Sequence, residues 1–469
     1  MPHGEIETFL RQYAADDYAR FHMPGHKGGL GFSHDQKSMA ASWDITEIAG
    51  ADNLLMPESI IRRAQQKAAE AFGAKHTFFL TCGSTAGLLA ALLSLPKHST
   101  VWVARDCHKS IVSGCVLADI NAVFMESPYD EKMHRWGVWD AEAIESALVK
   151  RTPPAALIVT RPDYWGRCVD LRPIKALCRR HDMLLIVDEA HGAHFSFSDH
   201  LPNSASQYAD IWVQSAHKTL AAWNQCAYLH MGERDVAYMP SEDRIRRALQ
   251  WIHTTSPSYP MLEALERASQ VDGNIWSAHI KRIQRWKASL SDDWQMRMRG
   301  RGQDRGVGEI DPTRLIIEAQ TTGRTGYQLA EFLYERKIVV EMMDAQCVVL
   351  ITTPSDPDEW YARLARALRD IPEYEKIDDA SMQIWSDAPY TACERIMPIR
   401  DAALADVEIV PTEQAKGRIC AQSAGLYPPG YALILPGERI DLQMIDYIEQ
   451  SKALGAEPFG WPPLCVKEG

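Results

Sequence analysis

The sequence lacks the marks of a secreted or membrane protein. Its ten cysteines form no C-x-x-C pair and follow no regular spacing, which predicts reduced, mostly buried thiols. No apolar run reaches the ~18 residues that a membrane span requires. Acidic residues interrupt the first twenty positions, where a signal peptide would carry a basic end and then an apolar run. We therefore expect a cytoplasmic protein with no membrane partner and no metal site.

The charge balance argues against a nucleic-acid partner. The chain has 50 Lys and Arg against 62 Asp and Glu, a formal net charge of −12, which is the wrong sign for binding phosphate backbones. The remaining composition, with 46% apolar and 24% charged residues, is that of an ordinary globular protein. At roughly 100–200 residues per domain, a chain of 469 residues predicts two to four domains.

From about residue 76, short apolar runs rich in β-branched and aromatic residues alternate with amphipathic stretches. Several runs are apolar on both faces, as expected of central strands in a mostly parallel α/β sheet covered by helices on both sides. The expected strands are His76–Thr81, Thr100–Ala104, Ala122–Met125, Ala155–Thr160, Met183–Asp188, Asp210–Gln214 and Cys226–Met231. The expected helices between them include Gly83–Leu95, Lys109–Ala118, Ala141–Val149 and Pro173–His181.

The rest of the chain predicts further units. A long helical pattern follows Tyr259 as far as Leu290, and Arg297–Gly308 then breaks it with four arginines and four glycines, typical of a solvated loop between domains. Beyond this loop we expect a small α/β unit, with strands Arg314–Ala319, Ile338–Met342 and Val348–Thr352 and a helix Tyr327–Arg336. The predicted division is an N-terminal segment 1–45, a large domain 46–296, a small α/β domain 297–372 and a C-terminal α+β domain 373–469.

Polar residues gather where the predicted strands end. They are Gly83, Ser84, Thr85, His108, Asp188, His191, Ser215, His217 and Lys218. Since ligands of open α/β sheets bind at the carboxyl ends of the strands, residues more than 130 positions apart can meet there in one crevice.

Two of these residues carry the chemistry. A desolvated Lys218 could form a Schiff base with an aldehyde, although most lysines do not. Asp188 ends a very apolar strand, where a carboxylate is costly without a cationic or hydrogen-bonding partner, and a protonated pyridine nitrogen would be one. These are the groups that a pyridoxal-phosphate enzyme needs.

The turn at Gly83, Ser84 and Thr85 adds a phosphate cradle at a helix N-terminus. The turn alone fits equally well an ordinary helix cap with Ser84 or Thr85 at the N-cap. His108 could stack on a cofactor ring, whereas a lone loop histidine is more often a surface residue.

At this point the chain resembles a known family, the fold-type-I pyridoxal-phosphate ornithine/lysine/arginine decarboxylases, in the short form without the N-terminal wing domain. The resemblance extends from residue 21 to residue 438, nearly the whole chain, with several motifs in the family's order. The matching stretches are His22–Gly28, Asp44–Asp52, Ala71–Thr85, Asp106–Ser110, Asp188–His194, Ser215–Leu220, Thr255–Tyr259, Val340-Glu341 and Tyr427–Glu438. It implies an aspartate-aminotransferase-like fold, with a seven-stranded sheet in the large cofactor-binding domain and a C-terminal decarboxylase domain.

The resemblance also implies an activity and roles. The protein would decarboxylate arginine, lysine or ornithine to the amine and carbon dioxide, a step of amino-acid metabolism and polyamine biosynthesis, through a Lys218 aldimine and a quinonoid intermediate. Asp188 would pair with the pyridinium nitrogen, His108 would stack on the ring, and His191 would lie beside it. Residues Gly83, Ser84, Thr85, Ser215 and His217 would bind the phosphate. The family's site forms between subunits, which implies a homodimer or a higher assembly, with Ser256 and Ser258 reaching the partner's phosphate.

Specificity for a basic substrate needs an anion, and the resemblance indicates Glu341, with Asp344 as a weaker candidate. The alternative for Glu341 is a structural ion pair with an arginine. Cys82, Leu88, Trp165 and Trp223 depart from the family pattern and leave the choice of amino acid open.

Other functions compete with decarboxylation. An aminotransferase generally holds the substrate carboxylate with a small-domain arginine, and Val348–Pro354 offers none. A carboxylate without such a partner suits its loss as carbon dioxide, because a salt bridge would stabilise the ground state more than the transition state. An aldolase or another lyase, and a non-catalytic relative, remain as alternatives.

Overall fold

The structure, a computed structural model, describes residues 19–21, 30–31 and 52–467, with gaps at 131–134, 234–235, 293, 295–297, 299–304, 320–321, 372–391, 428–429, 431 and 454. The motif His22–Gly28, most of Asp44–Asp52 and most of the arginine-rich loop lie outside these residues. The division into four domains therefore stays a prediction, and the units below are described by the sheets that they contain.

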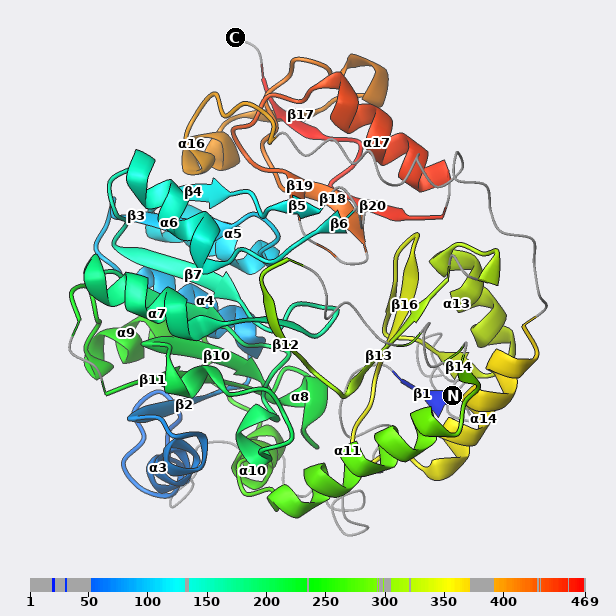
Figure 1. Cartoon of the computed structure of the whole chain (residues 1–469). Helices are drawn as coiled ribbons and strands as arrows, with labels where there is room; N and C mark the ends of the chain where they lie inside the picture. The colour runs from blue at the N-terminus through cyan, green and yellow to red at the C-terminus, as the bar shows by residue number, and fades with distance from the viewer. Residues whose placement is uncertain are drawn as a thin grey trace, which may run out of the picture.

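A seven-stranded sheet forms the centre of the large unit (Figure 1). Its order is β2 (His76–Leu80), β11 (Ala227–Met231), β10 (Ile211–Ser215), β9 (Leu184–Asp188), β7 (Ala156–Thr160), β3 (Thr100–Ala104) and β4 (Asn121–Met125). β11 runs antiparallel to both of its neighbours, and the pairs from β10 to β4 are parallel. The seven predicted strands and the mostly parallel sheet are confirmed, with strand ends that differ by one residue at most.

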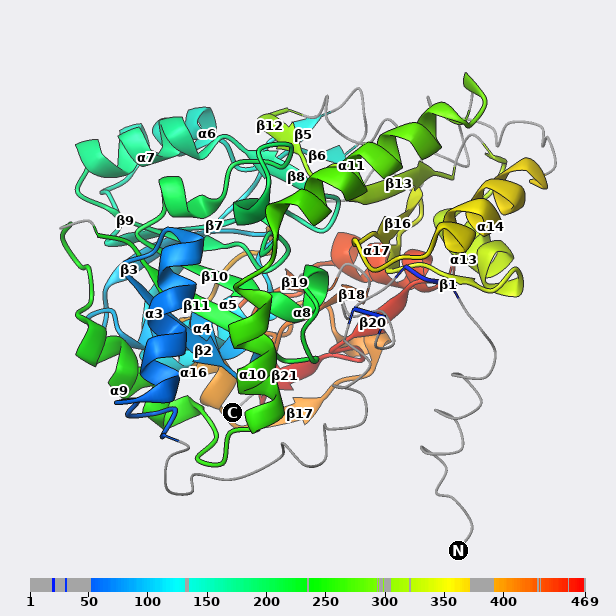
Figure 2. The same cartoon turned by 90° about the horizontal axis from the view of Figure 1, so that it is seen from below.

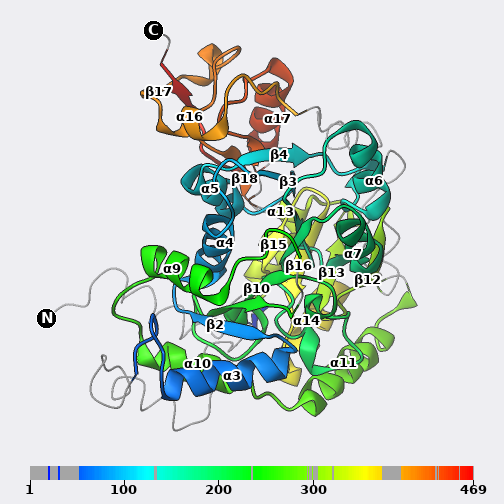
Figure 3. The same cartoon turned by 90° about the vertical axis from the view of Figure 1, so that its left-hand side faces the viewer.

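Helices cover both faces of this sheet, because successive side chains of each strand point to opposite faces and nearly all of them are apolar. Figure 3 shows α4 (Gly83–Leu93), α5 (Lys109–Ala118) and α9 (Glu242–Ile252) on one side, and α6 (Ala141–Lys150) and α7 (Leu171–Arg180) on the other. Val103 and Ile158 pack under the first group, and Trp102 and Leu157 under the second. The four predicted helices are confirmed.

The helical pattern from Tyr259 to Leu290 is two helices, not one. α10 (Tyr259–Ala268) ends before Asp272, whose side chain accepts a hydrogen bond from the backbone N–H of Asn274 and so starts α11 (Gly273–Ala288). In Figure 2, α11 crosses from the large unit to the small one. Its residues agree with this path, since Trp276 packs in the core of the large unit and Ile283 in that of the small unit.

The small unit holds the three-stranded sheet β13 (Arg314–Glu318), β16 (Cys347–Ile351) and β15 (Met342–Met343), with α13 (Gly326–Glu335) and α14 (Asp358–Arg369). The predicted strand Ile338–Met342 is wrong as a single element. Its first part, β14 (Ile338–Val339), pairs with β1 (Ala19–Arg20), whereas β15 pairs with β16. A chain that passes from one sheet to another must bend, and the bend falls at Val340 and Glu341.

The C-terminal unit lies at the top of Figure 1, beside α5 and β4. It contains α16 (Ile399–Leu404), β17 (Val407–Ile409), β18 (Ala424–Tyr427), β19 (Ala432–Ile434), α17 (Leu442–Ala453), β20 (Glu457–Phe459) and β21 (Leu464–Val466). Ile399 and Leu435 belong to the same apolar core as α4 and α5, so this unit packs directly on the large one.

Short elements complete the described chain. They are α3 (Ile60–Phe72), β5 (Tyr129–Asp130), β6 (Arg135–Trp136), β8 (Arg167–Val169), α8 (Ala216–Thr219), β12 (Val307–Ile310) and 3-10 turns at Phe195–Phe197, Ala205–Gln207 and Thr412–Gln414. All ten cysteines are free and nine are buried, as predicted. Among the described helices, none is both long and apolar enough to cross a bilayer.

Candidate active site

The predicted polar residues meet at the carboxyl ends of β2, β3, β9 and β10. Lys218 lies in α8, a single turn that follows β10 directly, and Figure 1 shows α8 between the large sheet and the unit that holds β13 and β16. Asp188 is the last residue of β9, and His108 follows β3 at the start of α5. The parallel strand order brings these segments to one edge of the sheet, as the sequence predicts.

Lys218 is a half-buried amine with a lowered pKa. Loss of solvation is the main cause, and it brings the pKa from 10.5 to about 8, with Arg314 acting in the same direction. The carboxylates of Asp188 and Glu341 act against this shift. The Nζ atom lies 2.8 Å from Nε2 of His191, a buried ring whose own pKa is far below its usual value, mainly because of burial. The lowered pKa therefore makes about a tenth of Lys218 neutral and nucleophilic at pH 7, and about half of it at pH 8.

Asp188 and His108 both face this amine. The Asp188 carboxylate is buried, and its Oδ1 accepts one hydrogen bond, from the backbone N–H of Ala190 at 3.1 Å. His108 is half-buried, and burial lowers its pKa while the negative charge of Asp188 opposes the shift. Its Nδ1 accepts from the backbone N–H of Ser110 at 3.2 Å and caps α5. The surface alternative for His108 is therefore wrong, and in the neutral ring the proton lies on Nε2.

A cradle for an anion opens at the start of α4. Gly83 has φ +77°, and a Cβ atom added there would meet nothing within 4 Å, so the turn faces open space. The N-cap is Cys82, which makes no side-chain capping bond, so the alternative with Ser84 or Thr85 as the N-cap is wrong. Ser84 instead accepts a hydrogen bond from the Ser215 hydroxyl at 2.9 Å, which joins the ends of β2 and β10. The open space, the hydroxyls and the helix N-terminus that follows them fit a phosphate group, while the Gly83 N–H itself donates to the carbonyl oxygen of Gln225 at 2.9 Å.

His217 and Thr85 lie beside this cradle in different settings. The His217 ring is buried, and its Nδ1 lies 3.0 Å from the carbonyl oxygen of Cys226, so Nδ1–H donates and Nε2 is left as an acceptor. Thr85 is exposed on the first turn of α4.

Glu341 acts on the site from the small unit. It lies at the bend between β14 and β15, is half-buried, and raises the pKa of Lys218 and of Tyr164. Asp344 stabilises the turn before β16, because its Oδ1 accepts hydrogen bonds from the backbone N–H groups of Gln346 and Cys347 at 2.7 Å.

Ser256 and Ser258 precede α10. Ser256 is exposed and Ser258 is half-buried at the N-cap, where it makes no side-chain capping bond. Their predicted reach to the phosphate of a partner subunit stays a prediction.

Two further residues of the site are not predicted from the sequence. Arg314 begins β13, directly opposite Ile351 of β16, and its Nη2 lies 3.1 Å from His191 Nδ1 and 3.3 Å from the His191 carbonyl oxygen. Val348–Pro354 indeed contains no arginine, but the neighbouring strand supplies one. The Tyr164 ring lies against His191, with centroids 4.6 Å apart, and Lys218 Nζ lies 5.8 Å from its centroid. An arginine at the start of the apolar run RLIIE was the available signal.

The departures from the family pattern lie mostly away from the amine. Leu88 is buried in the core under the sheet. Trp165 packs beneath the small sheet with Ile316 and Val349. Cys82 is half-exposed at the start of α4, and Trp223 packs partly buried beside the core of α3 and α10.

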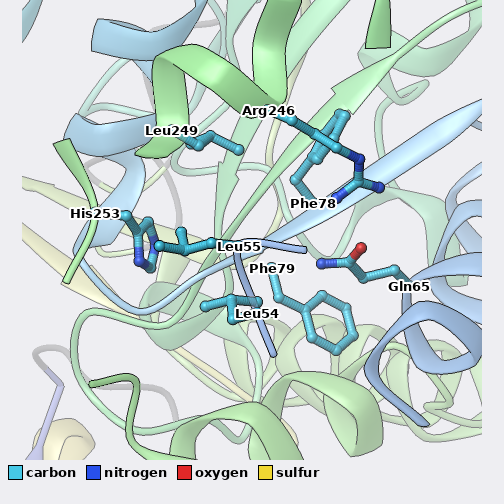
Figure 4. A pocket seen from close by; sticks show the side chains of 8 residues that line it. All are labelled: Leu54, Leu55, Gln65, Phe78, Phe79, Arg246, Leu249 and His253. Carbon is cyan, nitrogen blue, oxygen red and sulfur yellow. The ribbon is translucent and has the colours of Figure 1, made fainter. Parts of the chain in front are cut away.

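A separate pocket lies beside β2 (Figure 4). His253 lines it, and its Nε2 accepts from the backbone N–H of Thr81 at 3.2 Å, so this ring supports the end of β2. The lining residues are Leu54, Leu55, Gln65, Phe78, Phe79, Arg246, Leu249 and His253, and they include none of the residues described above. In the part of the chain that the structure describes, no three His, Cys, Asp or Glu side chains are arranged to hold a metal ion.

The chain was compared with known proteins. The family model of the Orn/Lys/Arg decarboxylase major domain matches residues 6–301, and that of the C-terminal domain matches residues 382–461. An arginine decarboxylase of Bacillus subtilis (strain 168) is 32% identical over 464 residues, which cover 94% of this chain and 92% of that protein.

Solved structures show the same fold. The lysine decarboxylase LdcF of Francisella novicida has a TM-score of 0.74 at 20% identity, covering 98% of this chain and 80% of that one. The alanine–glyoxylate aminotransferase of Nostoc sp. has a TM-score of 0.53 at 16% identity, covering 72% of this chain and 92% of that one. The fold is therefore that of the fold-type-I pyridoxal-phosphate enzymes.

Proposed function

Because the chain belongs to the Orn/Lys/Arg decarboxylase family, and is an amino-acid decarboxylase, we propose that it converts arginine, lysine or ornithine to the amine and carbon dioxide with pyridoxal phosphate. The observation that carries the proposal is the half-buried Lys218 amine, with a pKa of about 8, facing the Asp188 carboxylate and the His108 ring. The name of the Bacillus subtilis relative supports arginine as the first substrate to test.

The residues fit the cofactor at each of its functional groups. Lys218 would hold the aldehyde end, Asp188 the pyridine nitrogen, and His108 the face of the ring. The N–H groups at the start of α4 would hold the phosphate together with Ser84, Thr85, Ser215 and His217. When bound, pyridoxal phosphate supplies an electron sink for the pair left on Cα as carbon dioxide departs. Asp188 would sustain that sink, because a buried carboxylate favours a proton on a pyridine nitrogen placed next to it.

Protons are held at two nitrogen atoms of the site. His108 Nδ1 accepts hydrogen bonds from Ser110, so the neutral ring carries its proton on Nε2. Lys218 Nζ exchanges protons near neutral pH, given its pKa of about 8. Either His108 or Lys218 can return a proton to Cα.

The negative charge of Glu341 would select a substrate with a basic side chain. Glu341 reaches the site from the small unit and acts on both Lys218 and Tyr164. Its carboxylate would pair with the guanidinium or ammonium group of the substrate. The Arg314 guanidinium donates to His191, and a substrate carboxylate that it does not hold is lost more easily as carbon dioxide.

The assembly and location belong to the same proposal. The protein forms a cytoplasmic homodimer or a higher homo-oligomer, in which Ser256 and Ser258 complete the site of the partner subunit. Size-exclusion chromatography with light scattering tests this part by itself.

The decisive experiment is carbon dioxide release from the cofactor-loaded protein supplied with arginine, lysine, ornithine or an aromatic amino acid. We expect release from one basic amino acid, loss of release in Lys218→Ala, and unchanged release in Lys97→Ala, an exposed lysine. A yellow protein that releases carbon dioxide from none of them contradicts decarboxylation. Assays for keto-acid formation and aldol cleavage would then test the two alternative reactions.

A further inference from the structure

Arg314 is a buried arginine with few partners. Its side chain has no exposed surface, and among the described residues its Nε and Nη1 atoms have no hydrogen-bond acceptor. The nearest carboxylate oxygen, Oδ2 of Asp311, lies 3.9 Å from Nη1, and Asp311 also pairs with His194. Burying a guanidinium with unmet donors is costly, and such groups are usually kept for a function.

The surrounding residues hold this side chain in place. Gly166 packs so closely on it that an added Cβ atom would lie 2.7 Å from Arg314 Cγ. Asp311 is fixed by hydrogen bonds from the backbone N–H and the hydroxyl of Thr313, at 2.9 and 2.7 Å. Arg314 therefore presents its Nη2 to His191 from a rigid position.

The hydrogen bonds fix the tautomer of His191. A guanidinium is only a donor, so Nδ1 of His191, 3.1 Å from Arg314 Nη2, must be the acceptor. A neutral imidazole that accepts at Nδ1 carries its proton on Nε2. Nε2 lies 2.8 Å from Lys218 Nζ, so this N–H donates to the lone pair of an uncharged amine.

We propose that Arg314 is a positioning residue which, through His191, favours the neutral form of the Lys218 amine, the form that adds to the aldehyde of the cofactor. The inference rests on the proposed role of Lys218 as the residue that carries the cofactor. In this proposal Arg314 acts on Lys218 of the large unit and does not bind the substrate carboxylate.

The other charged groups around Lys218 set the direction of the effect. From β9 and the turn after it come Asp188 and His191, from the N-cap of α5 His108, from the loop before β8 Tyr164, from β13 Arg314, and from the bend before β15 Glu341. Arg314 is the only permanent cation among these six groups. Its removal leaves the two carboxylates unopposed, and it frees His191 to move its proton to Nδ1 and accept from an ammonium at Nε2. Both changes raise the pKa of Lys218.

The test measures Lys218 in the cofactor-free protein, so that it is independent of catalysis. Trace acetylation with acetic anhydride across pH 6 to 11, read by mass spectrometry of the Lys218 peptide, reports the neutral fraction of that amine. We expect a midpoint near 8 in the wild type and an upward shift of roughly one to two pH units in Arg314→Met. Arg314→Lys should restore most of the wild-type midpoint because it keeps the cation.

His191→Phe removes the ring nitrogens that contact Arg314 and Lys218, and its ring fills the space so that water does not replace the imidazole. We expect an upward shift smaller than that of Arg314→Met, because the charge of Arg314 remains, and a shift in the double variant that is smaller than the sum of the two single shifts, as for residues that share one contact. This variant carries the test if Arg314→Met does not fold. The control is Arg363→Met, which removes a cation from α14 and should leave the midpoint unchanged.

Two results would overturn the proposal. One is an unchanged midpoint in folded Arg314→Met and His191→Phe, and the other is equal shifts in Arg314→Lys and Arg314→Met, which would mark a packing role. Failure of the proposed decarboxylation gives a different pattern, in which carbon dioxide release is absent while these midpoints still shift.

Discussion

A buried ion pair joins the C-terminal unit to the loop that carries His108, and its loss should loosen both. Arg105 Nη1 and Nη2 each donate to one carboxylate oxygen of Glu438 at 2.7 Å. Nη2 also donates to the carbonyl oxygen of Leu433 at 2.8 Å, and Glu438 accepts from the backbone N–H of Leu435 at 2.9 Å. The two side chains are only 9% and 2% exposed. We predict that Glu438→Gln weakens the packing of the C-terminal unit on the large one.

The size of the effect follows from this geometry. The pair is bidentate and almost free of solvent, so screening reduces it little. Glu438→Gln leaves a buried guanidinium without its counter-charge, and breaking such a pair costs about 3–5 kcal/mol. A more exposed pair with a single contact gives the scale for comparison: Arg418 Nη2 and Glu408 Oε1 are 2.6 Å apart, with 16% and 46% of the two side chains exposed. Glu408→Gln should cost about 1 kcal/mol or less.

The assay must be local, because a chain of several units need not unfold in one step. Hydrogen exchange with mass spectrometry, on peptides that cover β19 and residues 104–110, measures the free energy of opening at both sides of the contact. We expect exchange in Glu438→Gln to be faster by about two to three orders of magnitude, by the factor of ten per 1.4 kcal/mol. Equal protection in Glu438→Gln and Glu408→Gln would refute the reasoning.

Three other predictions concern the site. Asp188→Asn should lower the rate of carbon dioxide release by roughly 10²-fold or more, because the neutral amide no longer holds a proton on the cofactor nitrogen. The rate is measured from the carbon dioxide released after a fixed time, and an unchanged rate would show that Asp188 has no part in the mechanism. Glu341→Gln should raise KM for the basic substrate by roughly 10- to 100-fold, the value of one charge-assisted contact, and a structural ion pair would instead lower stability with KM unchanged. Lys218→Met should raise the free energy of unfolding of the cofactor-free protein at pH 7, measured with urea, because the lowered pKa makes the protonated folded chain costly. This gain should shrink between pH 8 and 10.5, where the folded and the unfolded lysine become neutral in turn.

The sequence predicted the large sheet because each of its strands is marked locally. Runs such as Ala156–Thr160 and Leu184–Asp188 are apolar on both faces and end in polar residues, so the alternation of strands and helices locates both the sheet and its functional edge. The site residues from this edge could be identified for the same reason, since each lies at the end of a strand or shortly after it. Because the strands are parallel, their carboxyl ends lie at one edge of the sheet, and this brings the residues together.

Contacts between units were beyond such reasoning. Arg314 and His191 are 123 positions apart, and Arg105 and Glu438 are 333 apart, with no periodicity that links them. The bend at Glu341 depends on β14 pairing with β1, a strand near the start of the chain. Patterns along a strand report which face is buried, but the choice of partner strand is decided by packing between units. The N-cap at Cys82 escaped prediction as well, because serine and threonine are the usual capping residues and both follow it.

The position of Arg314 bears on how a fold shared with aminotransferases favours decarboxylation. A guanidinium that paired with the substrate carboxylate would stabilise the charged ground state, and this stabilisation is lost when the carboxylate leaves as neutral carbon dioxide. In this chain the small unit supplies a cation from β13, Arg314, and its Nη2 donates to His191 Nδ1, 3.1 Å away. Its charge still disfavours an ammonium at Lys218, so under the proposed function it would assist cofactor binding without strengthening the bond that must break. On this argument the direction in which Arg314 donates, more than its presence in the small unit, decides between the two reactions.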